Sequence, residues 1–261
     1  MSTRTVLIVV ICLPLLSCST TTLKFSGAVE PISSPILLQY APYTATQVTV
    51  TEVSFTAPGT LANTHTSRTT CEVQIIKQVR GLRSINSCTE YTEGKSNEYQ
   101  FTADISPLGK YSNVEYNDSR QNSDDEKENQ LIDSLKQGIE NNESYVIRNP
   151  IVSGSSIFKI RASDFLRMFN INTASDATFN DVVRGWGTYE GRRVLVAEIN
   201  IDETFSISAT GTLRIRMSGY KIIDAKTMAI LSSKGAATAD LTDKGETARL
   251  EMNMTSATSL K

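Results

Sequence analysis

The chain is poor in the residues on which most enzyme sites are built. It has one histidine, one tryptophan and four cysteines among 261 residues. A Ser-His-Asp hydrolase needs a histidine base, but His65 stands in a threonine-rich stretch and the chain has no Gly-x-Ser-x-Gly turn. A zinc site needs three or four His, Cys or acidic ligands, which neither the thiol spacing nor the histidine count supplies. We therefore predict no catalytic residue, no metal and no cofactor.

The chain also lacks an excess of one charge. Its formal net charge is −2 and no stretch forms a basic stripe, which argues against nucleic acid as a partner. It has no Gly-x-Gly-x-x-Gly or Walker loop, so nucleotide binding is not expected. A carboxylate pair for glycoside hydrolysis stays open, because such a pair forms only in three dimensions. The acids nearest the second half of the predicted sheet are Glu190, Glu198, Asp202 and Glu203.

No apolar run is long enough to span a bilayer, which takes about 20 residues. The run Val6–Leu13 follows Arg4 and fits the apolar part of a secretory signal. It ends in Leu15-Leu16-Ser17-Cys18, which resembles a bacterial lipobox. That resemblance implies cleavage between Ser17 and Cys18 and a lipid, including palmitate, on the Cys18 thiol. The alternative is an ordinary signal peptide in which Cys18 is incidental.

The residue after the cysteine is Ser19 rather than Asp. By the sorting rule of double-membraned bacteria, the lipobox resemblance therefore implies the outer membrane. We expect residues 1–17 to be a signal peptide and residues 18–44 a lipid-anchored tether, broken by prolines. A single antiparallel β domain is expected over residues 45–255, with a tail at residues 256–261.

Cys71 and Cys88 remain once Cys12 is assigned to the signal and Cys18 to the lipid. An even pair in an oxidising compartment favours a disulfide. The flanking sequences form a hairpin around a loop that ends at Gly81, and pairing Lys77 with Leu82 sets the two cysteines directly opposite each other. Cross-strand neighbours are close enough for an S–S bond. A redox or metal pair is the alternative.

One long helix is predicted at residues 123–142. Ser123 and Glu126 form a capping box, and an apolar stripe follows at helical spacing: Leu131, Ile132, Leu135 and Ile139. We expect this helix to pack over the sheet, with partner binding as the alternative. A shorter helix capped by Ser163 is predicted to present Phe165 and Phe169 as part of an apolar plug over residues 164–169.

The rest of the chain alternates between apolar and polar residues, as half-buried strands do. Leu213, Ile215 and Met217 alternate with Arg214 and Arg216, and a last strand carries Leu250, Met252 and Met254. Short turns join these segments, which favours antiparallel pairing. We predict a mainly β fold of the β-rich α+β kind: a curved antiparallel sheet or half-barrel with one or two helices packed on it.

The single tryptophan, Trp186, stands between Gly185 and Gly187, and we place it in a loop. There it would serve as a rim or anchor side chain, with core packing as the alternative. Trp186, Phe165 and Phe169 are thus the candidate contacts for a ligand or a partner.

The chain resembles periplasmic half-barrels that carry or receive lipoproteins. The resemblance rests on the lipobox, the antiparallel strands, the plug and the turn Asp224-Ala225-Lys226-Thr227. This resemblance implies a membrane-anchored, non-enzymatic envelope lipoprotein that binds an apolar ligand or another envelope protein on its curved sheet. Two alternatives remain. One is a structural or surface interaction lipoprotein without a ligand cavity, and the other is a cell-wall-directed hydrolase.

Overall fold

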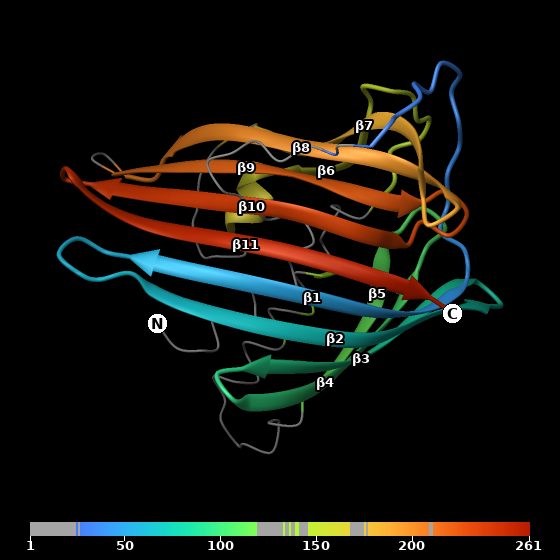
Figure 1. The fold of residues 1–261 in the computed structure, drawn as a ribbon, viewed down its shortest axis with the longest axis horizontal. Coiled ribbons are helices and arrows are strands. Elements are labelled where there is room, and N and C mark those ends of the chain that lie inside the picture. The colour runs from blue at the N-terminus through green and yellow to red at the C-terminus, as the bar shows by residue number, and fades with distance from the viewer. Residues whose placement is uncertain are drawn as a thin grey trace.

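The computed structural model describes residues 25, 27–118, 133, 136, 139–140, 146–167, 175, 177–208 and 211–261 (Figure 1). The expected signal and lipobox, Met1 to Cys18, lie outside the described residues, as does most of the predicted helix 123–142. None of the described helices is long and apolar enough to cross a membrane.

Eleven strands form one antiparallel sheet, in the order β5-β4-β3-β2-β1-β11-β10-β9-β8-β7-β6. The first half of the chain contributes β1 (Tyr43–Thr56), β2 (Asn63–Gln78), β3 (Gly81–Thr92), β4 (Lys95–Ile105) and β5 (Tyr111–Asp118). The second half contributes β6 (Ser156–Arg161), β7 (Thr178–Tyr189), β8 (Arg192–Ser206), β9 (Gly211–Asp224), β10 (Ile230–Asp243) and β11 (Glu246–Leu260). The predicted antiparallel, mainly β fold is therefore confirmed.

Short turns join neighbouring strands from β1 to β5 and from β7 to β11, so each of these two runs is a meander, whereas β6 is joined to β7 by residues 162–177, which include α3. The turns carry the expected residues. Gly81 and Gly109 have φ values of 97° and 95°, in the left-handed region where glycine has no Cβ to clash. The two meanders join where β1 pairs with β11 through a continuous register from Ala45–Leu260 to Thr56–Arg249.

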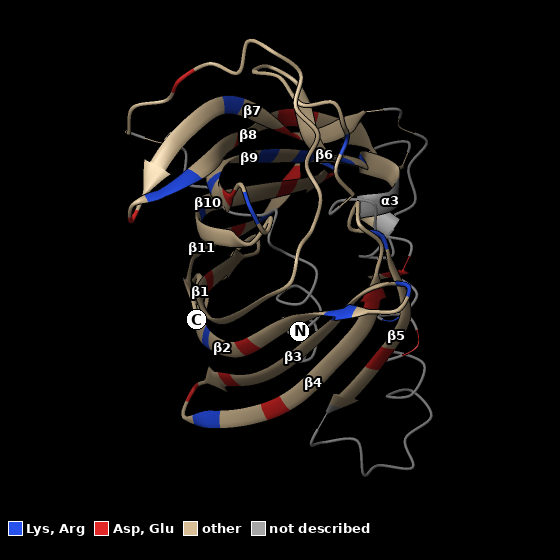
Figure 2. Cartoon of the chain, turned by 90° about the vertical axis from the view of Figure 1, so that its right-hand side faces the viewer, with Lys and Arg blue, Asp and Glu red and all other residues tan. Residues whose placement is uncertain are grey.

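The sheet is strongly curved and open. Viewed roughly along the strands, the sheet follows an arc from β7 through β11 and β1 to β4 (Figure 2). The two end strands, β5 and β6, both lie on the side of the molecule opposite the middle of this arc. Among the strand pairs of the described residues, β5 and β6 do not pair with each other. We call the concave side, on which α3 (Ala162–Arg167) and residues 30–42 lie, the inner face.

Residues 30–42, which belong to the segment expected to be a tether, pack against the sheet. Glu30 forms an isolated bridge with Trp186, and Ile36 forms one with Ile151. Ile32 and Leu38 are buried in the same cluster as Leu195. The prolines of this segment end regular structure without preventing burial of the apolar residues between them.

One boundary of the predicted β domain was wrong. Residues 256–260 are strand rather than tail, because β11 pairs with β1 through Leu260.

The described helical residues fall where the two helices were predicted, except that α3 begins at Ala162, so Ser163 lies within this helix and is not its cap. Ile139 is helical and buried against Ala103 and Val114, so this part of the predicted helix packs on the sheet. Leu166 of α3 is buried against Phe179 and other residues of the inner face.

Candidate functional site

The inner face over β7, β8 and β9 is apolar. Its buried side chains alternate with outward-facing polar ones over most of each strand. Near the β7–β8 and β9–β10 turns the other face is apolar as well, since Val194, Val196 and Ile222 are buried there. The buried side chains of the inner face form one cluster with Val53, Met252 and Leu166: Phe179 on β7, Ile199, Ile201 and Phe205 on β8, and Leu213, Ile215 and Met217 on β9. Of the apolar clusters in the described part of the chain, this one contains the most buried residues.

A second apolar cluster continues the inner face toward the turns that join β7 to β8 and β9 to β10. It combines Val183, Leu195 and Ile223 of the sheet with Ile32 and Leu38 of the incoming chain. Phe158, Ile151 and Met228 complete it. The incoming chain therefore covers this part of the inner face.

A buried ion pair lies on the inner face among these apolar residues. Lys221 of β9 donates to Asp181 of β7 over 2.5 Å, and their side chains are only 6% and 1% exposed. The ammonium of Lys221 also lies 5.4 Å from the centre of the Phe158 ring, where the negative face of the ring attracts a cation. Burying two charges is costly unless they pair closely, so this contact fixes β7 against β9 across β8.

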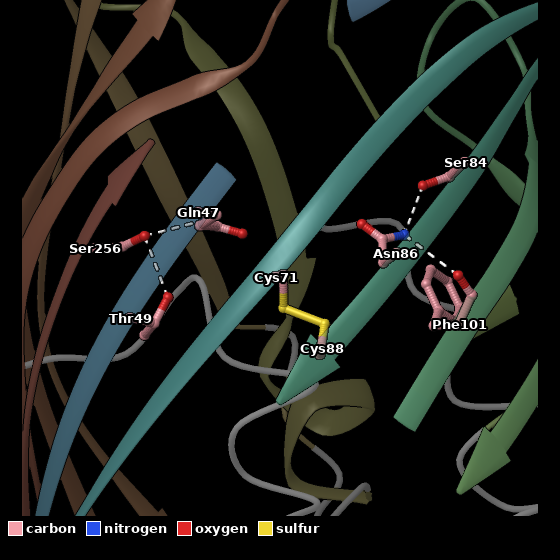
Figure 3. Close-up of a disulfide and its surroundings, with 8 residues drawn as sticks. All are labelled: Gln47, Thr49, Cys71, Ser84, Asn86, Cys88, Phe101 and Ser256. Atoms are coloured by element: carbon pink, nitrogen blue, oxygen red, sulfur yellow. Dashed lines mark hydrogen bonds between the residues drawn. A yellow bond between two sulfur atoms is a disulfide. The ribbon is translucent and has the colours of Figure 1, made fainter. Parts of the chain in front are cut away.

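The inner face of the first meander is different in chemistry. Its buried positions are rich in hydroxyl groups: Thr51, Ser67, Thr69 and Ser84, together with Glu90. Gln47 and Thr49 of β1 both donate to the Ser256 hydroxyl of β11, at 3.0 and 3.2 Å (Figure 3). The inner face is thus apolar over β7 to β9, whereas over β1 to β3 it carries these hydroxyl groups next to a smaller apolar cluster of Val73, Ile75, Leu82 and Ile105. We call the two parts the apolar half and the hydroxyl-rich half.

The disulfide predicted from the hairpin is confirmed. Cys71 of β2 and Cys88 of β3 are directly paired in the register and bonded, with their Cα atoms 4.1 Å apart. The bond lies in the hydroxyl-rich half, beside the strand that carries Gln47 and Thr49 (Figure 3). Because both sulfurs are held inside the sheet, the pair is a structural cross-link of β2 and β3.

Aromatic residues line β4 and β5 next to this half. Tyr99 stacks near Tyr116 with ring centres 5.8 Å apart, and Phe101 lies 6.0 Å from Tyr111. Burial raises the pKa of the Tyr111 phenol to about 12. This hydroxyl therefore stays protonated at neutral pH and can serve as a hydrogen-bond donor.

Trp186 lies in β7 rather than in the predicted loop. It exchanges two backbone hydrogen bonds with Glu30, at 2.7 and 2.8 Å, so the incoming chain continues the sheet at this point. The ring is partly buried against the second apolar cluster, and the Arg193 guanidinium lies 4.3 Å from its centre. Gly185 permits this approach, because a Cβ there would lie 2.2 Å from the Glu30 carbonyl oxygen.

The side chains of the other predicted contact residues are not described by the structure. Phe165 belongs to α3, but its side chain is outside the described part, and Phe169 lies wholly outside it. Ser17 and Cys18 also lie outside the described residues.

The acids considered for hydrolysis are dispersed. Glu190 lies in the turn before β8, and the other three are spread along β8. Arg214 binds Asp202 through two contacts of 2.7 Å, and the hydrogen bond from Arg214 holds the pKa of Asp202 below its usual value. Glu198 faces Arg184 at 3.5 Å, while His65 contacts Glu93 at the far end of the sheet. No group of three potential metal ligands occurs within the described residues.

No protein-family profile matches the sequence, and no curated protein sequence matches it either. Among solved structures, the chain is similar to one described as "Lipid-protein interactions in lipovitellin", with a TM-score of 0.44 and 8% identity. That match covers 86% of this chain but only 26% of the lipovitellin chain.

Two further solved structures are more distantly similar. DynF, from the dynemicin biosynthesis pathway of Micromonospora chersina, has a TM-score of 0.24 and 10% identity, covering 92% of this chain and 90% of its own. A LolA superfamily protein from Nitrosomonas europaea has a TM-score of 0.16 and 11% identity, covering 82% and 87%. TM-scores this low do not assign the chain to a family or an activity.

Proposed function

We propose that this protein is a lipid-anchored, non-enzymatic lipoprotein of the bacterial outer membrane that holds an apolar ligand on the inner face of its sheet. The observation that carries the ligand proposal is the division of that face. An apolar cluster over β7 to β9 and buried hydroxyl groups over β1 to β3 lie on the same inner face of one curved sheet, with β10 and β11 between them. The lipobox at Leu15 to Cys18 supports the anchor.

This division suits an acyl lipid. Its chain would lie along the apolar half, where removal from water yields roughly 25 cal/mol per Å² of apolar surface. Its polar end would meet the threonine and serine hydroxyls of β1 to β3. Entry between β5 and β6 is part of this proposal, since these end strands share no ladder within the described residues.

Trp186 supplies a direct test, because it is the only tryptophan and packs against an apolar cluster of the inner face. Bromine quenches tryptophan fluorescence at short range. We expect a brominated fatty acid to quench Trp186 in a saturable way, and the unbrominated acid to reverse that quenching.

A variant that fills the inner face sharpens this test. Ala237 packs against the apolar cluster of β7 to β9, so Ala237→Phe should weaken the apparent affinity about tenfold through overpacking. Thr212→Phe is the matched control, since Thr212 is exposed on β9. Absent or non-saturable quenching, or equal effects of both variants, would show that the inner face is a filled core, which favours the structural lipoprotein instead.

A further inference from the structure

One end of the sheet gathers four turns from both meanders. Because neighbouring strands are antiparallel, the β2–β3, β4–β5, β7–β8 and β9–β10 turns lie at the same end, on the right of Figure 1 and toward the viewer in Figure 2. The chain also enters β1 at this end, and β11 finishes there. We call it the entry end.

Backbone contacts hold the turns of the entry end together. The Tyr40 amide donates to the Pro107 carbonyl of the β4–β5 turn over 2.9 Å, and the Ala41 amide donates to the Thr227 carbonyl of the β9–β10 turn over 3.4 Å. The Ala225 amide in turn donates to the Arg193 carbonyl at the start of β8, over 3.3 Å. Turns from opposite halves of the sheet therefore form one continuous surface.

This surface is basic. Its turns and the adjoining strand ends expose Lys77, Arg80, Lys110, Arg192, Arg193 and Lys226. The exposed acid among them is Glu190, whereas Asp224 is buried and accepts hydrogen bonds from the Thr227 amide and hydroxyl. Within the described part of the chain, Lys77, Arg80, Lys110 and Lys226 form no ion pair with an acid.

Apolar side chains are exposed in two of these turns and in the incoming chain. Val79 at the tip of the β2–β3 turn is fully exposed, Leu108 in the β4–β5 turn is 43% exposed, and Leu37 in the incoming chain is 79% exposed. Apolar tips surrounded by basic residues suit the headgroup region of an anionic bilayer, where apolar groups enter the interface and cations meet the lipid phosphates.

The opposite end lacks this charge bias. It exposes an apolar side chain at Leu61, but its charged turn residues have both signs: Glu93, Lys95, Asp243, Lys244 and Glu246. Charge, rather than apolar exposure, therefore separates the two ends.

The distance that the chain can span from Cys18 also favours the entry end as the membrane-facing end. Phe25 packs on Tyr220 of β9, with ring centres 5.8 Å apart. Tyr220 lies four residues, or roughly 13 Å, from the entry end of β9 and nine residues, or roughly 30 Å, from its other end. The seven residues that separate Cys18 from Phe25 span at most about 25 Å. A lipid on Cys18 is thus within reach of the entry end, which is the nearer of the two ends.

We infer that the entry end is a membrane-facing surface that docks on an anionic lipid bilayer. It would orient the sheet with these turns against the headgroups and the opposite end away from them. This inference rests on the proposed lipid anchor, but it concerns the turns of the sheet rather than the ligand on the inner face.

Charge reversal in the full chain tests the inference, with Cys18→Ala in every protein so that acylation does not mask the weaker contact. The test variant carries Arg80→Glu and Lys226→Glu, and the matched control carries Lys95→Glu and Lys244→Glu in turns of the opposite end. Binding is measured by cosedimentation with vesicles of equimolar phosphatidylglycerol and phosphatidylcholine, and with vesicles of phosphatidylcholine alone. Residues 1–17 are present in all proteins, and binding to the phosphatidylcholine vesicles measures how much their apolar run contributes.

We expect the test variant to bind the anionic vesicles about thirtyfold more weakly, because each basic residue near the surface strengthens binding about fivefold and two are removed. The control should keep its binding within a factor of about three, and added salt should remove the difference. Equal losses in both variants, or equal binding to anionic and neutral vesicles, would overturn the inference. Quenching of Trp186 by the brominated fatty acid should be the same in both variants, so failure of the ligand proposal is detected separately.

Discussion

Lys221 and Asp181 place two charges inside an otherwise apolar surface, at 2.5 Å from each other. In a low-dielectric setting, the attraction of such a pair roughly offsets the cost of removing both charges from water. Its main effect is then on geometry: each charge alone is strongly unfavourable, so β7 and β9 must keep the spacing that brings both together. Phe158 adds a cation–π contact that further confines Lys221.

A double-mutant cycle measures this coupling. Lys221→Met or Asp181→Leu alone should lower the free energy of unfolding by about 3–5 kcal/mol, because each leaves one buried charge without its partner. The double variant should lose much less than the sum of the two. Urea unfolding followed by Trp186 fluorescence gives the values, and single losses under about 1 kcal/mol would mean that water reaches the pair.

Of the two residues in this ion pair, only one could be identified from the sequence. Lys221 interrupts an apolar run, Tyr220-Lys221-Ile222-Ile223, which marks it as a charge in a buried strand. Its partner could not be predicted, because Asp181 is 40 residues away and meets it only after β8 is inserted between them. The same limit applies to Trp186: the two flanking glycines suggested a loop, whereas Gly185 is there to let Glu30 approach the strand.

The hairpin of β2 and β3 is the element that was predicted most completely. Its register and its disulfide follow from local sequence, because the turn fixes which residues pair. The loop that was expected to end at Gly81 is shorter, since Gly81 is already the first residue of β3 and pairs with Gln78. The strands of the second meander were also predictable from alternation. The order in which the two meanders join was not, because pairing of β1 with β11 depends on residues 200 positions apart in the chain.

Removing the disulfide tests how much it contributes to this element. The two cysteines are separated by 17 positions, so the loss of loop-closure entropy predicts about 3 kcal/mol of stabilisation. The double variant Cys71→Ala, Cys88→Ala should lower the free energy of unfolding by about that amount and leave the strand content unchanged. Circular dichroism and urea unfolding check both expectations. Loss of the β signal in dilute buffer would instead mean that the hairpin depends on its cross-link to fold.

At the scale of the whole molecule, the curved sheet separates three surfaces. The inner face combines an apolar half with a hydroxyl-rich half, and the outer face of β8 to β11 carries cross-strand ion pairs such as Arg214 with Asp202 and Arg249 with Asp240. The entry end presents basic and apolar turns to one side. A lipid-anchored protein that docks by this end would hold its strands pointing away from the bilayer. The open side of the sheet would then be accessible to a ligand that leaves the membrane.

The curved antiparallel sheet was predictable as a class, because alternation and short turns recur along the chain. The residues that pack on its inner face could not be predicted. The packing of Ile32 and Leu38 against the sheet could not be deduced from a segment punctuated by proline. The apolar half of the inner face became visible only when β7, β8 and β9 were placed side by side.

The most direct test of the proposed function is mass spectrometry of the intact protein, purified from bacterial membranes and sprayed under conditions that preserve non-covalent contacts. We predict a mass that begins at Cys18 and includes its acyl chains, together with a second, non-covalent mass that corresponds to an acyl lipid and disappears on denaturation. The Ala237→Phe variant should keep the acylated mass and lose most of the non-covalent one. A protein with no bound apolar molecule under native conditions would contradict the proposal that the inner face holds a ligand, and an unmodified Cys18 would contradict the anchor.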